Sequence, residues 1–358
     1  MTKFSFTILF FLTYIYSYVS DFDNPSKDKL LIEIVSYVLN KGHYSPSQIN
    51  DQFSEEVYKN FLDGVDSRHL FFIQSDIDFF DSFKFEIDDQ IKTSKIEFFN
   101  LSHQRYLQRL DQVKSFYPSI LNQSFDFSIN EKINLDFENT SYSESLSELK
   151  KQWRKFLKFN ALGIYSNLKD DENRKKEKNP EYDLKADKEI EIETRNVLKE
   201  DMKYFFEARY DLNRNDYFSI YVNSIALQFD PHTSYFAPSA KDRFDQNMSG
   251  KFEGIGARLT KRNQEVEIVD IISGGPVWRE NSLRPGDKIL KVSQINETPV
   301  DVVGMRLDDV IKLIKGPKGT QVILTVKKVD GSVLDVILTR DVIELEEAFA
   351  KSTIIEKD

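Results

Sequence analysis

The sequence of 358 residues contains no cysteine. Disulfide bonds, thiolate nucleophiles and cysteine-based zinc sites are therefore excluded. Histidine is also scarce, and no two of the four histidines have the i, i+3 or i, i+4 spacing that places two metal ligands on one helix face. We therefore expect no metal and no cofactor. The histidines are His43, His69, His103 and His232.

Positive charge is in deficit, because the formal net charge is -10. A sequence-independent grip on nucleic acid needs a basic surface that displaces counterions from phosphates. We therefore expect no nucleic-acid partner. A basic run, NRKKEK at residues 173–178, lies among acidic residues, and we interpret it as a solvated loop.

Long apolar runs are missing beyond the N-terminus. Residues 1–20 carry Lys3, then an apolar stretch, and the chain turns acidic at Asp21. This is the pattern of a secretory signal, although Tyr18 stands where a small residue is wanted if cleavage follows Ser20. An uncleaved membrane anchor is the alternative. Both place the bulk of the chain outside the cytoplasm, with membrane contact only through this segment if it is retained.

Aromatic residues, by contrast, are plentiful: the chain has 29 Phe and 16 Tyr, whose surface must be buried. A chain of this length exceeds a single hydrophobic core, which stops growing at roughly 250–300 residues. We therefore expect two or more domains. In residues 21–235 apolar side chains recur with helical spacing and glycine and proline are sparse, which predicts a mostly α-helical domain with long helices at about 85–116 and 187–211.

Beyond Asp230 glycine becomes frequent and β-branched residues alternate. An amphipathic helix begins at Leu307 and ends before Gly316 and Pro317, and Asp330 and Gly331 predict a hairpin. This part of the chain is therefore expected to form a small domain of strands with one helix. The predicted strands are 257–260, 265–271, 288–292, 321–327 and 333–339.

The stretch KFEGIGARL at residues 251–259 comes just before the first of these strands. Two glycines that flank an apolar residue let successive backbone N–H groups point into one concavity, which suits a carboxylate. A peptide could then add as an extra strand, with its last side chain in an apolar pocket of the helix. A bare glycine turn is the alternative for this stretch taken alone. The candidate tail-binding residues are Gly254, Ile255, Gly256, Ala257, Arg258 and Leu259, with Leu307, Val310 and Ile311 on the helix.

Several motifs in a fixed order make the chain similar to the tail-specific proteases, also called C-terminal processing peptidases. The resemblance covers essentially everything after residue 20. The motifs that carry it are HYSPSQI from His43, LFFIQSDIDFF at 70–80, FDPHTSYFAP at 229–238, FEGIGA at 252–257, GGP at 274–276, LRPGDKIL at 283–290 and VDVVGMRLDDVIKLIKGPKG at 300–319.

The resemblance implies a multidomain α+β fold. Residues 21–235 would form the mostly α-helical N-terminal domain of a tail-specific protease, and residues 236–342 a PDZ domain, a small β-barrel-like sheet with an amphipathic helix. Residues 343–358 would begin a serine protease domain. Each of these ranges is an expectation at this point.

The family implies a periplasmic serine endopeptidase that recognises C-terminal tails of substrate proteins through the PDZ domain and cuts with a Ser nucleophile and a Lys base. That dyad belongs to a stretch that this sequence does not contain, so we assign no catalytic residue here and expect binding without cleavage. A lipoprotein adaptor and attachment to the inner membrane are further implied possibilities. The alternative is a non-catalytic PDZ-containing adaptor or chaperone that binds peptides.

Overall fold

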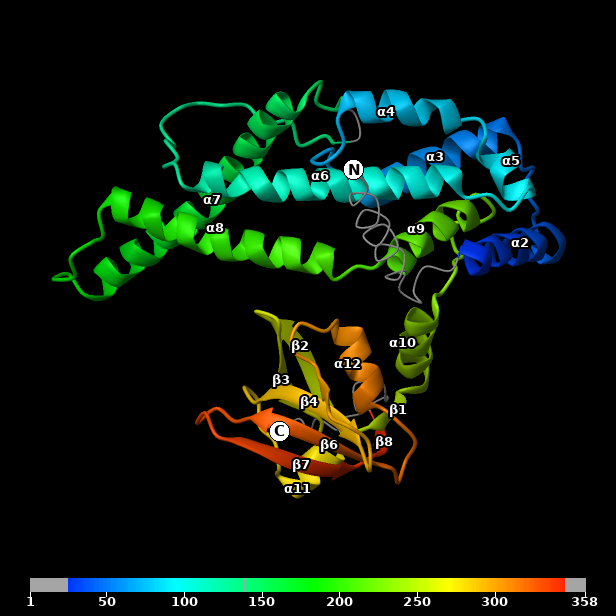
Figure 1. Cartoon of the computed structure of the whole chain (residues 1–358). Helices are drawn as coiled ribbons and strands as arrows, with labels where there is room; N and C mark the ends of the chain where they lie inside the picture. Colours follow the sequence, from blue (N-terminus) through cyan, green and yellow to red (C-terminus); the bar gives the residue numbers. More distant parts are fainter. Residues whose placement is uncertain (1–24, 138–139, 345–358) are drawn as a thin grey trace, which may run out of the picture. The chain divides into compact units, whose positions relative to one another are not determined.

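The computed structural model of the chain describes residues 25–137 and 140–344. These residues form two units, each with its own hydrophobic core, and the boundary falls between Tyr235 and Phe236 (Figure 1). The segment 1–20, expected as a signal or anchor, lies outside the described residues. So does all but the beginning of the segment 343–358.

The first unit is helical, as the apolar spacing predicts. Some of its helices begin where a side chain satisfies an unpaired amide: Asn50 accepts from the Phe53 N–H at 3.1 Å, and Ser145 from the Glu148 N–H at 3.3 Å. The elements are α2 (Pro25–Gly42), α3 (Asp51–Asp66), α4 (Gln74–Phe80), the 3-10 helix η1 (Asp81–Phe83), α5 (Ile87–Lys92), α6 (Glu97–Leu121), α7 (Leu146–Lys178), α8 (Asp187–Tyr210) and α9 (Arg214–Ala226).

Aromatic side chains fill the core of the helical unit. Trp153 is completely buried, and its indole N–H donates to the Leu70 carbonyl at 2.6 Å. Phe61, Phe98 and Tyr221 pack on one another with ring centroids 5.5 to 6.3 Å apart. The prediction that aromatic surface is buried is confirmed for these side chains, although others such as Tyr44 and Phe85 are exposed. The ring contacts stabilise the unit in addition to the buried area.

The prediction of one helix over residues 85–116 was wrong. Two helices, α5 and α6, are separated by a turn in which Ser94 has a φ of 54° and the Lys95 N–H donates to the Gln90 carbonyl at 2.7 Å. The Thr93 hydroxyl also donates to the Asp89 carbonyl at 2.7 Å, a local bond that competes with continuation of the helix. The helix predicted at 187–211 is confirmed as α8.

The interpretation of residues 173–178 as a loop was also wrong. They are the last turns of α7, and their side chains are exposed. Lysines suit this position because the carbonyl end of a helix carries partial negative charge. Lys175 in addition binds Glu172 at 2.7 Å within the same helix.

The second unit consists of strands and three helices, with the antiparallel order β2-β3-β4-β6-β7 and β5 paired to β4 (Figure 1). The strands are β1 (Lys251–Gly254), β2 (Ala257–Arg262), β3 (Glu265–Ile271), β4 (Lys288–Gln294), β5 (Val300–Asp301), β6 (Gln321–Lys327), β7 (Val333–Thr339) and β8 (Asp341–Glu344). The helices are α10 (Pro238–Ser249), α11 (Pro276–Glu280) and α12 (Leu307–Ile314).

The five predicted strands are confirmed as β2, β3, β4, β6 and β7, and the predicted helix as α12. The predicted hairpin is confirmed as well, because Gly331 has a φ of 88° between the antiparallel strands β6 and β7. Branched apolar side chains that alternate along the strands form the core, including Val266, Ile289 and Val322.

A second, two-stranded sheet was not predicted. β1 pairs with β8, and Phe252 lies opposite Ile343. Nearly ninety residues separate the two strands, and neither is long enough to show a clear period in the sequence. The structure therefore places residues 343 and 344 in this sheet, at the beginning of the segment 343–358 that the resemblance assigned to the next domain.

Two properties of the described part of the chain bear on function. Within residues 25–137 and 140–344, no group of three or more His, Asp or Glu side chains is placed to hold a metal ion. None of the helices in these ranges combines the length and the apolar character needed to cross a bilayer.

Candidate functional site

The turn between β1 and β2 is shaped by glycine. Gly256 has a φ of 78°, a region that side chains with a Cβ rarely adopt. A Cβ at Gly256 would also lie 3.0 Å from the Cα of Gly275. The second glycine of the GGP motif therefore serves a purpose that the sequence did not show: Gly275 has no side chain, so that the turn at Gly256 can lie against it.

Two backbone amides of this turn have no hydrogen-bond partner within the described ranges. The Ile255 carbonyl accepts from the Val277 N–H at 3.1 Å and the Gly256 carbonyl from the Ile272 N–H at 2.9 Å. The N–H groups of Ile255 and Gly256, by contrast, form no hydrogen bond with any described residue. Adjacent free amides of this kind form a concavity that favours an anion.

The main-chain groups of Ala257 point to an open edge of the sheet. β2 is the last strand in the order, so among the described strands only β3 flanks it. The Ile272 N–H donates to the Gly256 carbonyl, and Arg258 lies opposite Asp270. The main-chain groups of Gly256 and Arg258 therefore face β3. Because main-chain groups alternate along an antiparallel strand, those of Ala257 face away from β3.

Leu259 also presents its main chain to the open edge. It follows a register shift and lies opposite Ile268. The N–H and carbonyl of Ile268 bond to Asp287 and Gly286 on its other side, at 2.9 and 2.8 Å, so this is not a hydrogen-bonded pair with β2. Ala257 and Leu259 therefore leave main-chain donors and acceptors for an added strand.

A groove of about 560 Å³ runs along this edge, with β2 as one wall and α12 as the other. Figure 1 shows α12 beside β2. The wall formed by α12 is apolar, through Ile311 and Ile314, and Lys315 follows at the end of the helix. A pocket with main-chain donors on one side and apolar side chains on the other fits an extended peptide with an apolar end.

Most of the predicted residues line this groove. Gly254, Ile255, Gly256, Ala257, Arg258, Leu259 and Ile311 all do so.

Val310 and Leu307 are exceptions. Val310 is fully buried in the core, and Leu307 packs against the same core. Residues 307, 310, 311 and 314 share one broad apolar face of the helix, on which Ile311 lies about 100° from Val310. Val310 on this face thus holds α12 to the core, whereas Ile311 and Ile314 also line the groove.

Sequence reasoning missed five residues that line the groove. Val269 and Thr260 come from the strands, Ile314 and Lys315 from the end of α12, and Phe252 from β1. Phe252 and Lys315 could not be found by spacing, because β1 was not recognised and Lys315 follows the amphipathic helix. The available signal was the LIKGPKG motif, which puts a lysine where the helix must end.

Lys315 brings positive charge to the groove. Its ammonium group donates to Gln246 Oε1 at 2.8 Å and lies 5.1 Å from the ring centre of Phe252. Burial of this group lowers the pKa of Lys315, because a desolvated cation is less stable than its neutral form. The groove therefore combines free amides with a partly desolvated cation.

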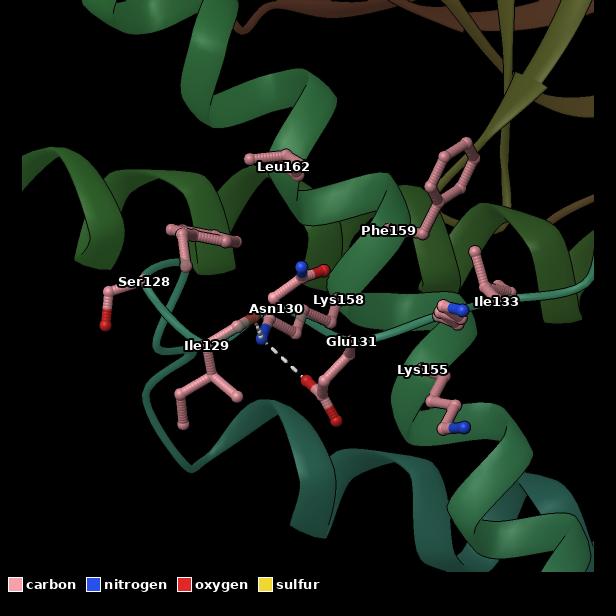
Figure 2. Close-up of a pocket in the computed structure, with 11 residues that line it drawn as sticks. Ser128, Ile129, Asn130, Glu131, Ile133, Lys155, Lys158, Phe159 and Leu162 are labelled. Atoms are coloured by element: carbon pink, nitrogen blue, oxygen red, sulfur yellow. Dashed lines mark hydrogen bonds and ion pairs between the residues drawn. The ribbon is translucent and has the colours of Figure 1, made fainter.

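A second hollow lies in the helical unit, between the loop after α6 and the side of α7 (Figure 2). It measures about 310 Å³, and Phe159 and Leu162 of α7 contribute apolar surface. Lys158 donates to Glu131 at 2.6 Å and to the Ile129 carbonyl at 3.1 Å. Because these polar groups bind one another, this hollow is a weaker candidate than the groove.

Comparison with known proteins covers both units. A family model described as "Tail specific protease N-terminal domain" matches residues 35–239, which is more than half of the chain. A second, described as "PDZ domain", matches residues 245–327. The groove lies in the part matched by the second model.

Relatives match over very different lengths. The chain is 28% identical over 317 residues to the Tail-specific protease of Haemophilus influenzae, covering 88% of this chain and 43% of that protein. It is 32% identical over 122 residues to the Carboxy-terminal processing protease CtpA of Bacillus subtilis, covering 34% and 25%. The chain therefore spans less than half the length of these two curated relatives.

A solved structure is also similar to part of the chain. The PDZ domain of the Carboxy-Terminal Protease from Vibrio cholerae, crystallised in complex with peptide, is 44% identical. The match covers 26% of this chain and 99% of that chain, with a TM-score of 0.26.

Proposed function

The chain belongs to the tail-specific protease family, and from this premise we propose that its groove binds the C-terminal tails of substrate proteins. The tail adds as a strand beside β2, and its terminal carboxylate rests on the turn that precedes β2. Recognition of a chain end, rather than of an internal segment, follows from the two free amides of this turn, which suit a terminal carboxylate.

The single observation that carries this proposal is the pair of unpartnered amides at Ile255 and Gly256. Both residues line the groove, and neither amide is bonded within the described ranges. A carboxylate satisfies two such donors at once through charge-assisted hydrogen bonds. A neutral chain end or a continuing peptide would leave this capacity partly unused.

The apolar wall supports a preference for small or medium apolar side chains at the tail end. Ile311 and Ile314 face the same groove as Leu259, so a side chain that points away from the sheet meets hydrocarbon on two sides. Burying such a side chain stabilises the complex by about 25 cal/mol per Å² of apolar surface removed from water. Affinity should remain moderate, because the peptide must be ordered on binding.

We further propose that the whole protein is a serine endopeptidase that degrades or processes the proteins whose tails it binds. The relatives are named as proteases, and this chain matches less than half their length. The Ser and Lys that cut would lie in the part of such proteins that this chain does not match. A periplasmic location, with attachment to the inner membrane if residues 1–20 are retained, and a lipoprotein adaptor remain part of this proposal.

Isothermal titration calorimetry of the full chain with paired peptides tests the tail-binding proposal. A peptide that ends in Val-Ala with a free carboxylate should bind about tenfold more tightly than the same peptide with an amidated end, because amidation removes the charge from the hydrogen bonds. Equal affinities would refute the carboxylate assignment. A peptide in which a charged residue replaces the last alanine is the control for the preference for an apolar side chain at the tail end.

The alternative of a non-catalytic adaptor makes the same binding prediction, and the gene sequence after the codon for Asp358 distinguishes the two functions. Coding sequence that supplies a serine and a lysine there supports the protease, whereas a stop codon supports the adaptor. Release of fragments from a tailed protein by these 358 residues alone would contradict both the adaptor and the claim that the cutting residues lie elsewhere.

A further inference from the structure

Lys315 lies beside the turn that bears the free amides. Its backbone N–H donates to the Ile311 carbonyl at 2.8 Å, which fixes the residue at the end of α12. Its Cγ is 3.8 Å from where a Cβ at Gly254 would be, immediately before Ile255 in the chain. The four-carbon side chain can therefore carry the ammonium group to an anion held by the Ile255 and Gly256 amides.

The ammonium group of Lys315 is bound by a neutral group, whereas the two nearest lysines in the sequence are bound by carboxylates. Lys312 binds Asp309 at 3.1 Å and Lys318 binds Asp341 at 2.9 Å. Among the residues that the structure describes, no carboxylate lies within ion-pair distance of Lys315, and its hydrogen bond goes to the amide oxygen of Gln246.

The hydrogen bond to Gln246 leaves the positive charge of Lys315 without an anion that compensates for it. A partly desolvated cation has lost part of its hydration, and a neutral amide compensates for this less well than an anion does. The more distant charges do not compensate for this burial: Asp242 and Asp308 stabilise the cation and Arg243 opposes it, but desolvation is the largest effect and the pKa of Lys315 is lowered. An anion in the groove would supply the missing charge.

Gln246 belongs to α10, the helix that follows the boundary between the two units. Among the described residues, two polar contacts join α10 to α12 and its end: Gln246 with Lys315, and Arg243 with Asp308 at 2.8 Å. Loss of the first would leave α10 held on this side by an exposed ion pair, and such pairs are weak. A ligand that takes the ammonium group away from Gln246 would therefore change how firmly α10 is held.

We propose that Lys315 is the countercharge for the terminal carboxylate of a bound tail, and that its ammonium group leaves Gln246 to bind it, which loosens α10. This inference rests on the proposed tail binding and adds to it a specificity-determining residue and a route from the groove to α10. The carboxylate is then bound by two amides and one ammonium group. Gln246 is the partner that holds Lys315 in the empty state.

The test compares Lys315→Met with the wild-type full chain, using the fluorescein-labelled Val-Ala peptide as free acid and as amide. Met keeps the length and the apolar stem of the side chain. We expect the affinity for the acid to fall about tenfold and that for the amide to change less than about twofold, because only the acid uses the charge. An unchanged affinity for the amide shows that the variant is folded.

Two matched variants sharpen this comparison. Lys315→Arg keeps the charge and should retain most of the preference for the acid. Lys312→Met removes a lysine from the same helix that is 65% exposed and does not line the groove, and it should leave both affinities unchanged. Gln246→Glu gives Lys315 an internal anion and should weaken binding of the acid several-fold while sparing the amide.

The outcomes separate this inference from the proposed function. If the wild type binds acid and amide equally, the carboxylate cradle is wrong. If the wild type prefers the acid and Lys315→Met keeps the full preference, the cradle stands and the role of Lys315 is wrong.

Hydrogen–deuterium exchange of residues 238–249 tests the proposal that binding of the tail loosens α10. The acid peptide should speed exchange in α10 of the wild type but not of Lys315→Met. Unchanged exchange in the wild type would refute the link to α10.

Discussion

Gly256 is the residue on which the geometry of the amide turn depends. Its positive φ turns its carbonyl towards Ile272 while its own N–H forms no hydrogen bond with the described residues, and its missing side chain lets Gly275 approach. Both properties are lost together if a Cβ is added. The same residue therefore affects stability and binding.

Gly256→Ala should destabilise the second unit by about 1–3 kcal/mol, through backbone strain and the contact with Gly275, and should weaken binding of the acid peptide at least tenfold. Exchange of β4 and β6 amides measures the stability, and fluorescence anisotropy measures the affinity. Gly331→Ala is the matched control, since its φ is 88° and its Cβ would meet no described atom within 4 Å. That variant should lose stability and keep full affinity; equal losses of affinity in both would contradict the prediction.

Asp341 gives a prediction for acid pH. Hydrogen bonds from Lys318 and Arg279 lower the pKa of Asp341 to about 2. Because the folded value lies below the unfolded one, its contribution to stability is present above about pH 4 and is lost as the pH falls towards 2. The difference in urea unfolding midpoint between the wild type and Asp341→Asn should therefore narrow between pH 5 and pH 2.5. A difference that stays constant over this range would count against the assignment.

At the scale of elements, α12 contributes both to the hydrophobic core and to the groove, through residues that are neighbours in the sequence. Val310 lies in the core, whereas Ile311, the next residue, lines the groove. A helix places consecutive residues about 100° apart, so neighbours in the sequence have different surroundings. Stability and recognition should therefore respond to different substitutions.

Val310→Ala should destabilise the second unit by about 2 kcal/mol and leave affinity nearly unchanged under conditions where the protein is folded. Ile311→Ala should cost less than about 1 kcal/mol of stability and weaken the Val-Ala peptide about threefold to tenfold. Hydrogen exchange and calorimetry on the two variants check this. A larger loss of affinity in Val310→Ala than in Ile311→Ala would reverse the assignment of the two faces.

The pairing of β1 with β8 places Ile343 against the turn that contains Gly256. Ile343 is buried, and its Cδ1 lies 3.3 Å from where a Cβ at Gly256 would be. Glycine at positions 256 and 275 is thus enclosed by a side chain from the last described strand. The groove depends on β8 although β8 does not line it.

Ile343→Ala should destabilise the second unit by about 2–4 kcal/mol and weaken binding of the acid peptide, because the turn loses a packing partner. Val342→Ala, on the same strand at a 37% exposed position, is the control and should change both quantities little. Thermal unfolding followed by circular dichroism and peptide titration distinguish the two. Full affinity in Ile343→Ala would show that the turn holds its shape without β8.

At the scale of the whole chain, the two units have separate hydrophobic cores, and every residue that lines the groove belongs to the second unit. The second unit also has the size of an ordinary domain. Tail binding should therefore be a property of this unit alone.

A fragment of residues 236–358 should fold by itself and bind the acid peptide within about threefold of the full chain. Calorimetry of the full chain should show two transitions, one of which the fragment reproduces. A fragment that is unfolded, or that binds more than tenfold more weakly, would show that the helical unit contributes to the groove.

The sequence by itself determined much of this protein. Periodicity located α8, α12 and five strands, because amphipathic elements with one buried face repeat with a fixed period. The glycines of KFEGIGARL identified the turn, although only Gly256 adopts the positive φ that favours glycine. The order of motifs indicated the family, which the match to residues 35–239 confirmed.

Only the tertiary structure decided the rest. The pairing of β1 with β8, the approach of Gly275 to Gly256 and the contact of Lys315 with Gln246 join residues that are far apart in the chain. Local propensity carries no information about such partners, because each contact depends on where the core directs both segments. The same reason placed Val310 in the core and Ile311 in the groove, since the position of the sheet decides which face of a helix is covered.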